Sequence, residues 1–239
     1  MKNILSSSFP LIYLLFFCLY FFSCSDRSVS PTVDEEQSTD NGFDLEVVTD
    51  IDGNVYPTKR IGGQLWMAEN LRVTHFRNGD PITEVSAQND WAVLDSGAYC
   101  SYGDETGNAD TYGLLYNWHA VSDSRSLAPT GWHIPTDKEW QILIDFLGGS
   151  ALAGDAMKDS SGWGKSGNGS NLSKFTARPG GVRYSSGLYD GIGYSASFWS
   201  SSRVGDDGAW GRRLSYLSPV VGRDDGNRLD GFSVRCVRD

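Results

Sequence analysis

The segment Tyr112–Trp140 constrains the fold of this chain most, because it combines several aromatic residues with a clear helix start. Thr136 is followed three residues later by Glu139. A threonine at the N-cap accepts from the amide of the third helical residue, whose glutamate side chain accepts in return from the threonine amide. Apolar residues then recur at helical spacing until Gly148. This pattern predicts an amphipathic helix over residues 136–147 that a glycine ends.

The rest of the domain reads as short strands separated by glycine-rich turns. Brief apolar runs between residues 43 and 71 are divided by Asp52-Gly53 and Gly62-Gly63, which is typical of strand pairs joined by tight turns. We also expect two short strands at residues 91–94 and 98–102 and a second, weaker helix at 151–158. A closing series of strands is expected at 175–184, 188–202, 209–217 and 231–239. The predicted class is α+β, with antiparallel sheets, one or two helices and long glycine-rich loops.

The first 23 residues read as a secretory signal. Lys2 precedes a long apolar run, and the small residue Ser23 stands directly before Cys24. Bacterial lipoproteins are cleaved and acylated at such a cysteine, and this segment resembles a relaxed lipobox in which Phe21 replaces the usual leucine. Two alternatives stay open: an uncleaved anchor helix, since the apolar run nearly spans a bilayer, and ordinary cleavage without a lipid.

A polar, acidic stretch without aromatic residues covers positions 24–42 and predicts a flexible tether, so the folded domain is expected at 43–239. A lipid on Cys24 would hold the domain at the outer membrane or cell surface. The chain has 30 acidic and 20 basic residues and a net charge of −10. Because this charge repels phosphate backbones, we do not expect a nucleic acid partner.

Two cysteines remain in the domain once Cys18 and Cys24 are assigned to the signal and the lipid site. An exported protein tends to pair such cysteines, so Cys100 and Cys236 are candidates for a disulfide. The alternative is two buried free thiols, because each lies in an apolar, strand-like context.

Aromatic and arginine side chains crowd the last third of the domain. Sugar rings stack on exposed aromatic rings, and arginine bonds hydroxyls and carboxylates well, so Trp199, Arg203, Trp210 and Arg213 are the candidate ligand-binding residues. The alternative is core packing, because alternation along strands buries about half of such residues. The wider set comprises Arg183, Tyr184, Tyr189, Tyr194, Arg212, Tyr216 and Arg223.

Signals for a metal site or a catalytic site are weak. Paired acids at Asp206-Asp207 and Asp224-Asp225 could hold calcium or simply form solvated turns, and the aspartates of residues 50–54 lack the glycine and glutamate of a calcium loop. The three histidines show no metal-ligand spacing, and no GxSxG motif occurs. We therefore expect no cofactor, with calcium as the one open alternative.

Several motifs in order resemble the Fibrobacter succinogenes major paralogous domain family, which occurs in exported proteins and lipoproteins. They are DIDGNVYPTKRIGGQLWMAENL, YGLLYNWHAV, APTGWHIPTDKEW, ARPGGVRY, FWSSS and GFSVRCVRD, over roughly residues 45–239. A more distant resemblance links residues 133–140 and 231–235 to formylglycine-generating enzymes and their C-type-lectin-like relatives. It implies a lectin-like fold whose termini meet in one sheet. Because they lie in the motifs that mark the fold, we expect four tryptophans in the core: Trp66, Trp118, Trp132 and Trp140.

The expected function is that of a lipid-anchored, non-catalytic binding module for a glycan or a surface protein. An enzyme on the formylglycine-generating scaffold is the alternative, although that chemistry uses a pair of copper-binding cysteines and only Cys236 lies in the matching region. A purely structural envelope component is the third reading.

Overall fold

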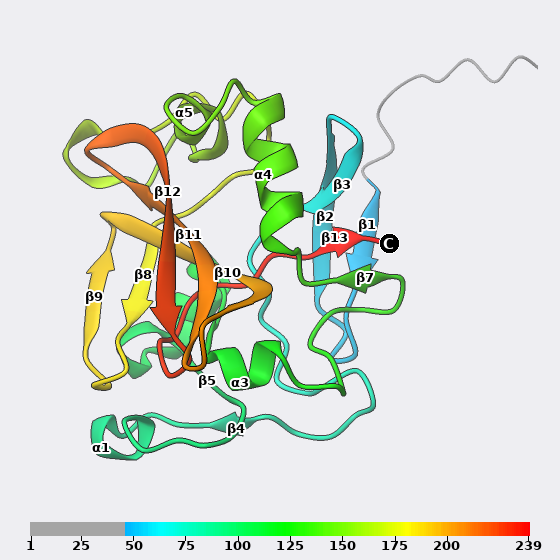
Figure 1. Ribbon diagram of the computed structural model, residues 1–239, viewed down its shortest axis with the longest axis vertical. Helices are drawn as coiled ribbons and strands as arrows, with labels where there is room; N and C mark the ends of the chain where they lie inside the picture. The colour runs from blue at the N-terminus through cyan, green and yellow to red at the C-terminus, as the bar shows by residue number, and fades with distance from the viewer. Residues whose placement is uncertain (1–45) are drawn as a thin grey trace, which may run out of the picture. The chain divides into compact units, whose positions relative to one another are not determined.

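Two five-stranded sheets and one small sheet organise the computed structural model, which describes residues 46–239 (Figure 1). Their strand orders are β1-β2-β3-β13-β7, β12-β11-β10-β8-β9 and β4-β5-β6. The strands are β1 Val47–Thr49, β2 Val55–Ile61, β3 Gln64–Met67, β4 Thr83–Glu84, β5 Ala98–Cys100, β6 Leu115–Tyr116, β7 Trp132–His133, β8 Gly180–Arg183, β9 Tyr189–Ile192, β10 Ser195–Val204, β11 Gly208–Ser215, β12 Ser218–Asn227 and β13 Val237–Arg238.

Helices are few and short. They are α1 Gln88–Trp91, α2 Thr106–Tyr112, α3 Trp118–Val121, α4 Asp137–Phe146 and α5 Ala153–Met157, with 3-10 turns at Tyr102–Asp104 and Gly164–Ser166. The fold is therefore mostly β, with curled antiparallel sheets. None of the helices in the described part of the chain has the length and apolar character that a membrane crossing requires.

The first sheet joins the two ends of the described chain. Strand β13 lies between β3 and β7, where Val237 pairs with Trp66 on one side and with His133 on the other. The hairpins β1–β2 and β2–β3 form where the sequence predicts them, and both turns use a glycine with positive φ, Gly53 at +84° and Gly62 at +59°.

Helix α4 matches its prediction at both ends. The Thr136 hydroxyl accepts from the Glu139 amide at 3.2 Å, and the Glu139 carboxylate accepts from the Thr136 amide at 2.8 Å. Beyond the helix, the Gly149 amide donates to the Ile144 carbonyl and the Gly148 amide to Asp145, a Schellman arrangement in which both glycines have positive φ. The capping box and the glycine stop are both confirmed.

The strand predicted at 91–94 is wrong. Residues Gln88–Trp91 form a single helical turn, and the Trp91 indole donates to the Leu229 carbonyl at 2.7 Å. Of the apolar run that suggested a strand, Trp91 is buried and anchors the loop, whereas Val93 is 78% exposed. The second helix does form, over Ala153–Met157, and β5 occupies part of the predicted 98–102 strand.

Tryptophans of the family motifs fill the interior, as the sequence predicts. Trp66 and Trp140 are fully buried with ring centroids 4.9 Å apart, and Trp118 and Trp132 are at most 6% exposed. Helix α4 packs against β10 and β11, so Trp140, Leu143, Phe198 and Leu214 share one core cluster. This covered side of the β8–β12 sheet is called the inner face below. Where α4 covers it, the inner face therefore has no room for a ligand.

Candidate functional site

Trp199, a candidate ligand-binding residue from the sequence, is a core residue. Its side chain is fully buried and stacks on Phe232 with centroids 4.1 Å apart. Its indole N–H donates to the Tyr116 carbonyl at 2.8 Å. Glycines make room for the stacked pair: a Cβ on Gly226 would come within 2.5 Å of the indole, and one on Gly211 within 3.2 Å of the Phe232 ring. The prediction of a ligand platform on Trp199 is wrong.

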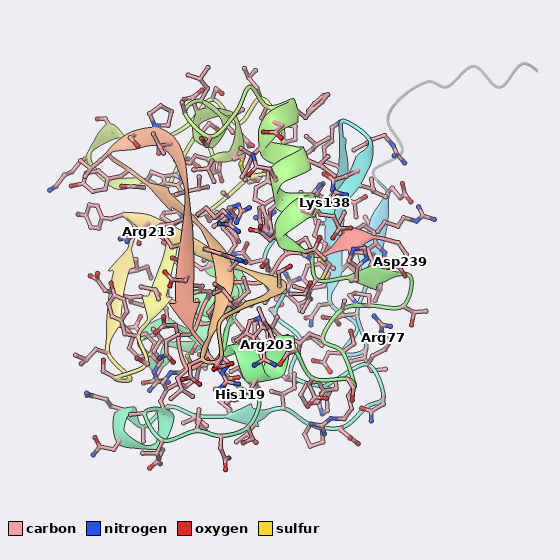
Figure 2. All side chains as sticks on the ribbon, viewed as in Figure 1. Arg77, His119, Lys138, Arg203, Arg213 and Asp239 are labelled. Atoms are coloured by element: carbon pink, nitrogen blue, oxygen red, sulfur yellow. The ribbon has the colours of Figure 1, made fainter. Side chains whose placement is uncertain are left out.

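Trp210 and Arg203 lie on the sheet but belong to no common site with Arg213. The Arg223 guanidinium lies 3.3 Å from the centre of the half-buried Trp210 ring and also binds Asp137 at 2.9 Å. One ring face is therefore already occupied. Arg203 is exposed near the β10–β11 turn, where it donates to the Asp206 carbonyl at 3.2 Å. Figure 2 shows Arg203 and Arg213 well separated along the sheet.

Two further arginines of the wider set hold loops in place instead of facing solvent. Arg183 is fully buried, donates to the carbonyls of Ser86 and Gly187 at 2.7 and 3.2 Å, and lies over the Trp91 ring. Arg212 is 1% exposed and pairs with Asp137 at 2.7 Å. Burial lowers the pKa of Arg212, although Asp137 works in the opposite direction. Neither guanidinium is available to a ligand.

Arg213 is the one residue of the four candidates that lines a hollowed surface. On the opposite side of the sheet from Arg212, two adjoining hollows both include Arg213 in their walls. We call this surface the outer groove. The first hollow measures about 520 Å³ and the second about 160 Å³. The first is lined by Tyr102, Lys165, Asp190, Tyr194, Ser195, Arg213 and Tyr216, among others, and the second by Tyr184, Ser197, Arg213, Asp224, Asp225 and Asp230, among others.

A pair of tyrosines forms the aromatic wall of the first hollow. The rings of Tyr194 and Tyr216 meet edge to face with centroids 5.2 Å apart, and the Tyr216 amide donates to the Tyr194 carbonyl at 2.9 Å. Tyr194 is 43% exposed and Tyr216 is partly buried. Both tyrosines belong to the aromatic set that the sequence indicated, so the structure retains the tyrosines of that set at the surface and buries Trp199.

The loop 160–171 lies against this tyrosine pair because its glycines allow close approach. A Cβ on Gly164 would come within 2.5 Å of the Tyr194 ring, and one on Gly167 within 2.5 Å of Tyr216. Trp163 anchors the loop, since its buried indole donates to the Ala177 carbonyl at 3.0 Å. Sequence reasoning treated this loop only as irregular.

Lys165 is the functional candidate that the sequence reasoning missed. Its ammonium lies 5.8 Å from the Tyr194 ring centre and 5.5 Å from that of Tyr216. Its backbone has φ of +49°, and Ser166 has +62°, a left-handed conformation that is costly for side chains other than glycine. The glycines on both sides of Lys165 were the available signal, because they mark a loop that must lie close to other atoms.

The hairpin turn that carries Tyr216 is held from behind by a buried lysine. Lys158 is 4% exposed, and its ammonium donates to the carbonyls of Ser215 and Ser218 at 3.2 and 3.3 Å. Burial lowers the pKa of this amine. Two hydrogen bonds from this amine therefore fix the turn that carries Tyr216.

The second hollow is acidic. Asp230 accepts from the amides of Ser185 and Asn227 at 2.7 and 3.0 Å, and burial nevertheless raises its pKa. Tyr184 donates to Asp190 at 3.3 Å, and burial followed by the nearby Asp190 charge raises the tyrosine pKa. This hydrogen bond joins a residue lining the second hollow to one lining the first. The groove therefore has a cationic part and an anionic part.

The disulfide predicted between Cys100 and Cys236 is not formed. Both cysteines are free and buried, and they belong to different core clusters, Cys100 with Trp91 and Leu115 and Cys236 with Tyr116 and Val234. Burial raises the pKa of both thiols well above the ordinary value of a cysteine, so neither is a reactive thiolate at neutral pH. Their structural context is that of small apolar core residues.

Several of the acidic groups that could suggest calcium are engaged in other contacts. Asp50 accepts from the amides of Asp52 and Asn54 and from the Tyr56 hydroxyl at 2.6 Å, as a turn requires. Asp207 pairs with Arg228 at 2.7 Å. Across residues 46–239, no group of three or more His, Cys, Asp or Glu side chains is arranged to hold a metal ion.

Two of the three histidines contact carboxylates. His133 contacts Asp239 through Nδ1 at 2.7 Å and Glu139 through Nε2 at 2.8 Å. Burial alone would lower the pKa of His133, but the two carboxylates outweigh it and the pKa is raised. His75 contacts Asp52 at 2.6 Å, and burial followed by the Arg228 charge lowers the pKa of His119. His133 thus ties the first sheet to the start of α4.

The predicted lipid site Cys24, the signal at 1–23 and the tether at 24–42 lie outside the described residues. Among curated proteins and solved structures, the comparisons found no match to this chain. The sequence pattern of the Fibrobacter succinogenes major domain matches residues 60–238, a span that includes both large sheets from β3 onward, α4 and the outer groove. The chain belongs to the Fibrobacter succinogenes major domain family.

Proposed function

We propose that this chain is a non-catalytic, lipid-anchored envelope domain that binds a glycan in the outer groove. The observation that carries the proposal is the first hollow, in which the tyrosine pair lies beside Arg213, Lys165 and Asp190. Its volume of about 520 Å³ falls within the roughly 300–1,000 Å³ of small-ligand sites.

The residue types of the hollow suit a sugar. The C–H faces of a sugar ring pack on the partly exposed ring of Tyr194, while hydroxyl groups bond to Asp190 and Ser195 at the wall. Arg213 supplies a fork of donors for hydroxyl or carboxylate oxygens. An aromatic surface bordered by a few fixed polar groups is what orients such a ligand.

Two further parts of the proposal concern fold and location. The pairing of β13 with β3 brings the two ends of the domain into one sheet, which supports a C-type-lectin-like fold. A lipid on Cys24 and a tether over 24–42 would place the groove outside the membrane at the outer membrane or cell surface. Labelling with a radioactive fatty acid, lost in Cys24→Ser, tests the anchor.

A glycan array tests the binding function directly. The fragment 25–239 is applied beside a Tyr194→Ala/Tyr216→Ala variant, with Leu172→Ala as the matched control, because Leu172 is 80% exposed and lines neither hollow. We expect retention of wild type and control, and loss of retention in the double variant. Failure of the wild type to bind any glycan would contradict the proposal, as would equal binding by the double variant.

A further inference from the structure

The two hollows of the outer groove differ in charge, and this difference selects a class of sugar. Lys165 and Arg213 line the first hollow together with one carboxylate, Asp190. The second hollow shares Arg213 but adds the carboxylates of Asp224 and Asp230; Asp225 pairs with Trp210, so its side chain points to the other side of the sheet. In a chain with a net charge of −10, two cations at one small site are a local reversal of the overall charge.

The two cations are free to take a ligand. In the described part of the chain, neither Arg213 nor Lys165 takes part in a salt bridge, whereas Arg212 and Arg223 both pair with Asp137. Arg213 is exposed, and its neighbours across the strands are the small residues Ser197 and Gly222, so nothing bulky beside it covers the guanidinium.

Lys165 is held in place by its loop. The Gly164 amide donates to the Gly193 carbonyl at 2.7 Å and the Gly167 amide to the Gly164 carbonyl at 2.9 Å, which fixes the backbone on both sides of the lysine. Its left-handed φ of +49° persists because these bonds and the buried Trp163 determine it. The result is an ammonium group placed over the two tyrosine rings that form the hollow's wall.

We infer that the first hollow selects a carboxylated sugar, a hexuronic acid, over its neutral counterpart; this inference rests on the glycan-binding function proposed above. The carboxylate lies on the Lys165 and Arg213 side, because charge-assisted hydrogen bonds from both are stronger than bonds to a hydroxyl. The ring packs on the tyrosine pair, and its hydroxyl groups face Asp190. The carboxylates of the second hollow repel the acid group and so orient the sugar.

The matched pair of probes is trigalacturonate and its methyl ester, which keeps every ring and hydroxyl but removes the charge. Isothermal titration with fragment 25–239 is expected to give a Kd at least about tenfold lower for the free acid. Arg213→Gln and Lys165→Gln should each remove most of that difference, while Arg203→Gln, an exposed arginine outside the groove, should keep it. Raising the salt concentration should reduce the difference in affinity between the free acid and the ester.

Each outcome decides a different point. Equal affinity for acid and ester would overturn the preference for a carboxylated sugar and leave the glycan-binding function standing. Absence of binding to either probe, with retention of other sugars on the array, would overturn the uronic acid inference alone. If no sugar binds at all, the proposed function itself fails. Thermal unfolding of each variant must match wild type, because neither side chain is part of the core. A variant that unfolds early is replaced by Arg213→Met or Lys165→Met, which also remove the charge.

Discussion

Arg212 and Arg213 are neighbours on β11, yet they belong to opposite faces of one sheet with opposite roles. The inner face is closed by α4, and Arg212 lies there at 1% exposure, paired with Asp137. The outer face is open at Arg213, where the two hollows meet. A single residue step along a strand therefore separates a guanidinium that holds the fold from one that can hold a ligand.

The same contrast separates the aromatic residues. Trp199 points to the same side of the sheet as Arg213, but Phe232 covers that end and the ring becomes core. The tyrosines at the other end contact each other and the 160–171 loop, and they stay partly exposed. What lies above a strand residue, and not its type, decides whether it serves stability or binding.

Truncating a buried and an exposed aromatic residue should give the largest difference in the free energy of unfolding. Trp199→Ala should lower the free energy of unfolding by roughly 3–5 kcal/mol, because it opens a cavity between Phe232 and the sheet. Tyr194→Ala should cost no more than about 1 kcal/mol, since its ring is 43% exposed. Urea unfolding of fragment 25–239 measures both, and similar losses for the two variants would remove the distinction.

Substitution of the neighbouring arginines should give the next largest difference in the free energy of unfolding. Arg212→Gln should cost roughly 2–4 kcal/mol, less than the full cost of breaking a buried ion pair because Arg223 still pairs with Asp137. Arg213→Gln should change the unfolding free energy by less than about 0.5 kcal/mol. The same urea series measures both variants. A stability loss at Arg213 as large as that at Arg212 would mean that the outer face is structural.

A glycine substitution in the loop tests how the outer groove is built. A Cβ at Gly164 meets the Tyr194 ring at 2.5 Å, so Gly164→Ala should displace the ring, cost about 1 kcal/mol of stability and weaken glycan retention. Gly63→Ala is the control, because a Cβ there meets nothing within 4 Å. Array binding and thermal unfolding of the pair measure the effect. Unchanged retention by Gly164→Ala would show that the tyrosine wall does not contact the ligand.

The smallest expected effect is a pH dependence of stability that comes from the His133 ion pairs, away from the outer groove. The pKa of His133 is raised in the fold, so the stability that its ion pairs contribute is fully present below its ordinary value of about 6.5 and is lost as the pH rises through the raised pKa. His133→Asn should therefore lower the Tm more at pH 5.5 than at pH 8.5. The effect should stay below about 1 kcal/mol, because the pair is partly exposed.

Arg213→Gln is the control for that measurement. Its Tm, relative to wild type, should not change between the two pH values, because Arg213 makes no contact with His133 among the described ion pairs. An equal Tm loss for His133→Asn at both pH values would contradict the assignment of the raised pKa.

Local features were predictable from the sequence where their determinants lie within a few residues. The capping box of Thr136 and Glu139 and the glycine stop at Gly148 formed as expected, because each bond spans three to five positions. The hairpin turns at Gly53 and Gly62 follow the same rule. The helical turn at Gln88–Trp91 did not, because its indole bonds to Leu229, far along the chain.

For the candidate site, the sequence indicated which types of residue take part but not which of them lie together. Tyr194, Tyr216 and Arg213 were in the aromatic and arginine set, but strand alternation alone cannot say that Phe232 covers Trp199 or that α4 covers Arg212. Lys165 escaped notice because its position over two tyrosine rings depends on a tertiary contact of the loop. The disulfide prediction was wrong because cysteine count says nothing of which core cluster each thiol joins.

Nuclear magnetic resonance mapping tests the central claim most directly. Fragment 25–239, labelled with ¹⁵N, is titrated with the oligosaccharide that the array retains best, and amide shifts are followed. We expect the shifts to gather at residues 164–167, 190–195 and 213–217, which contain most of the residues that line the first hollow. Shifts that gather instead around Arg203 and Trp210, or that spread through the core around Trp199, would contradict a binding site on the outer groove.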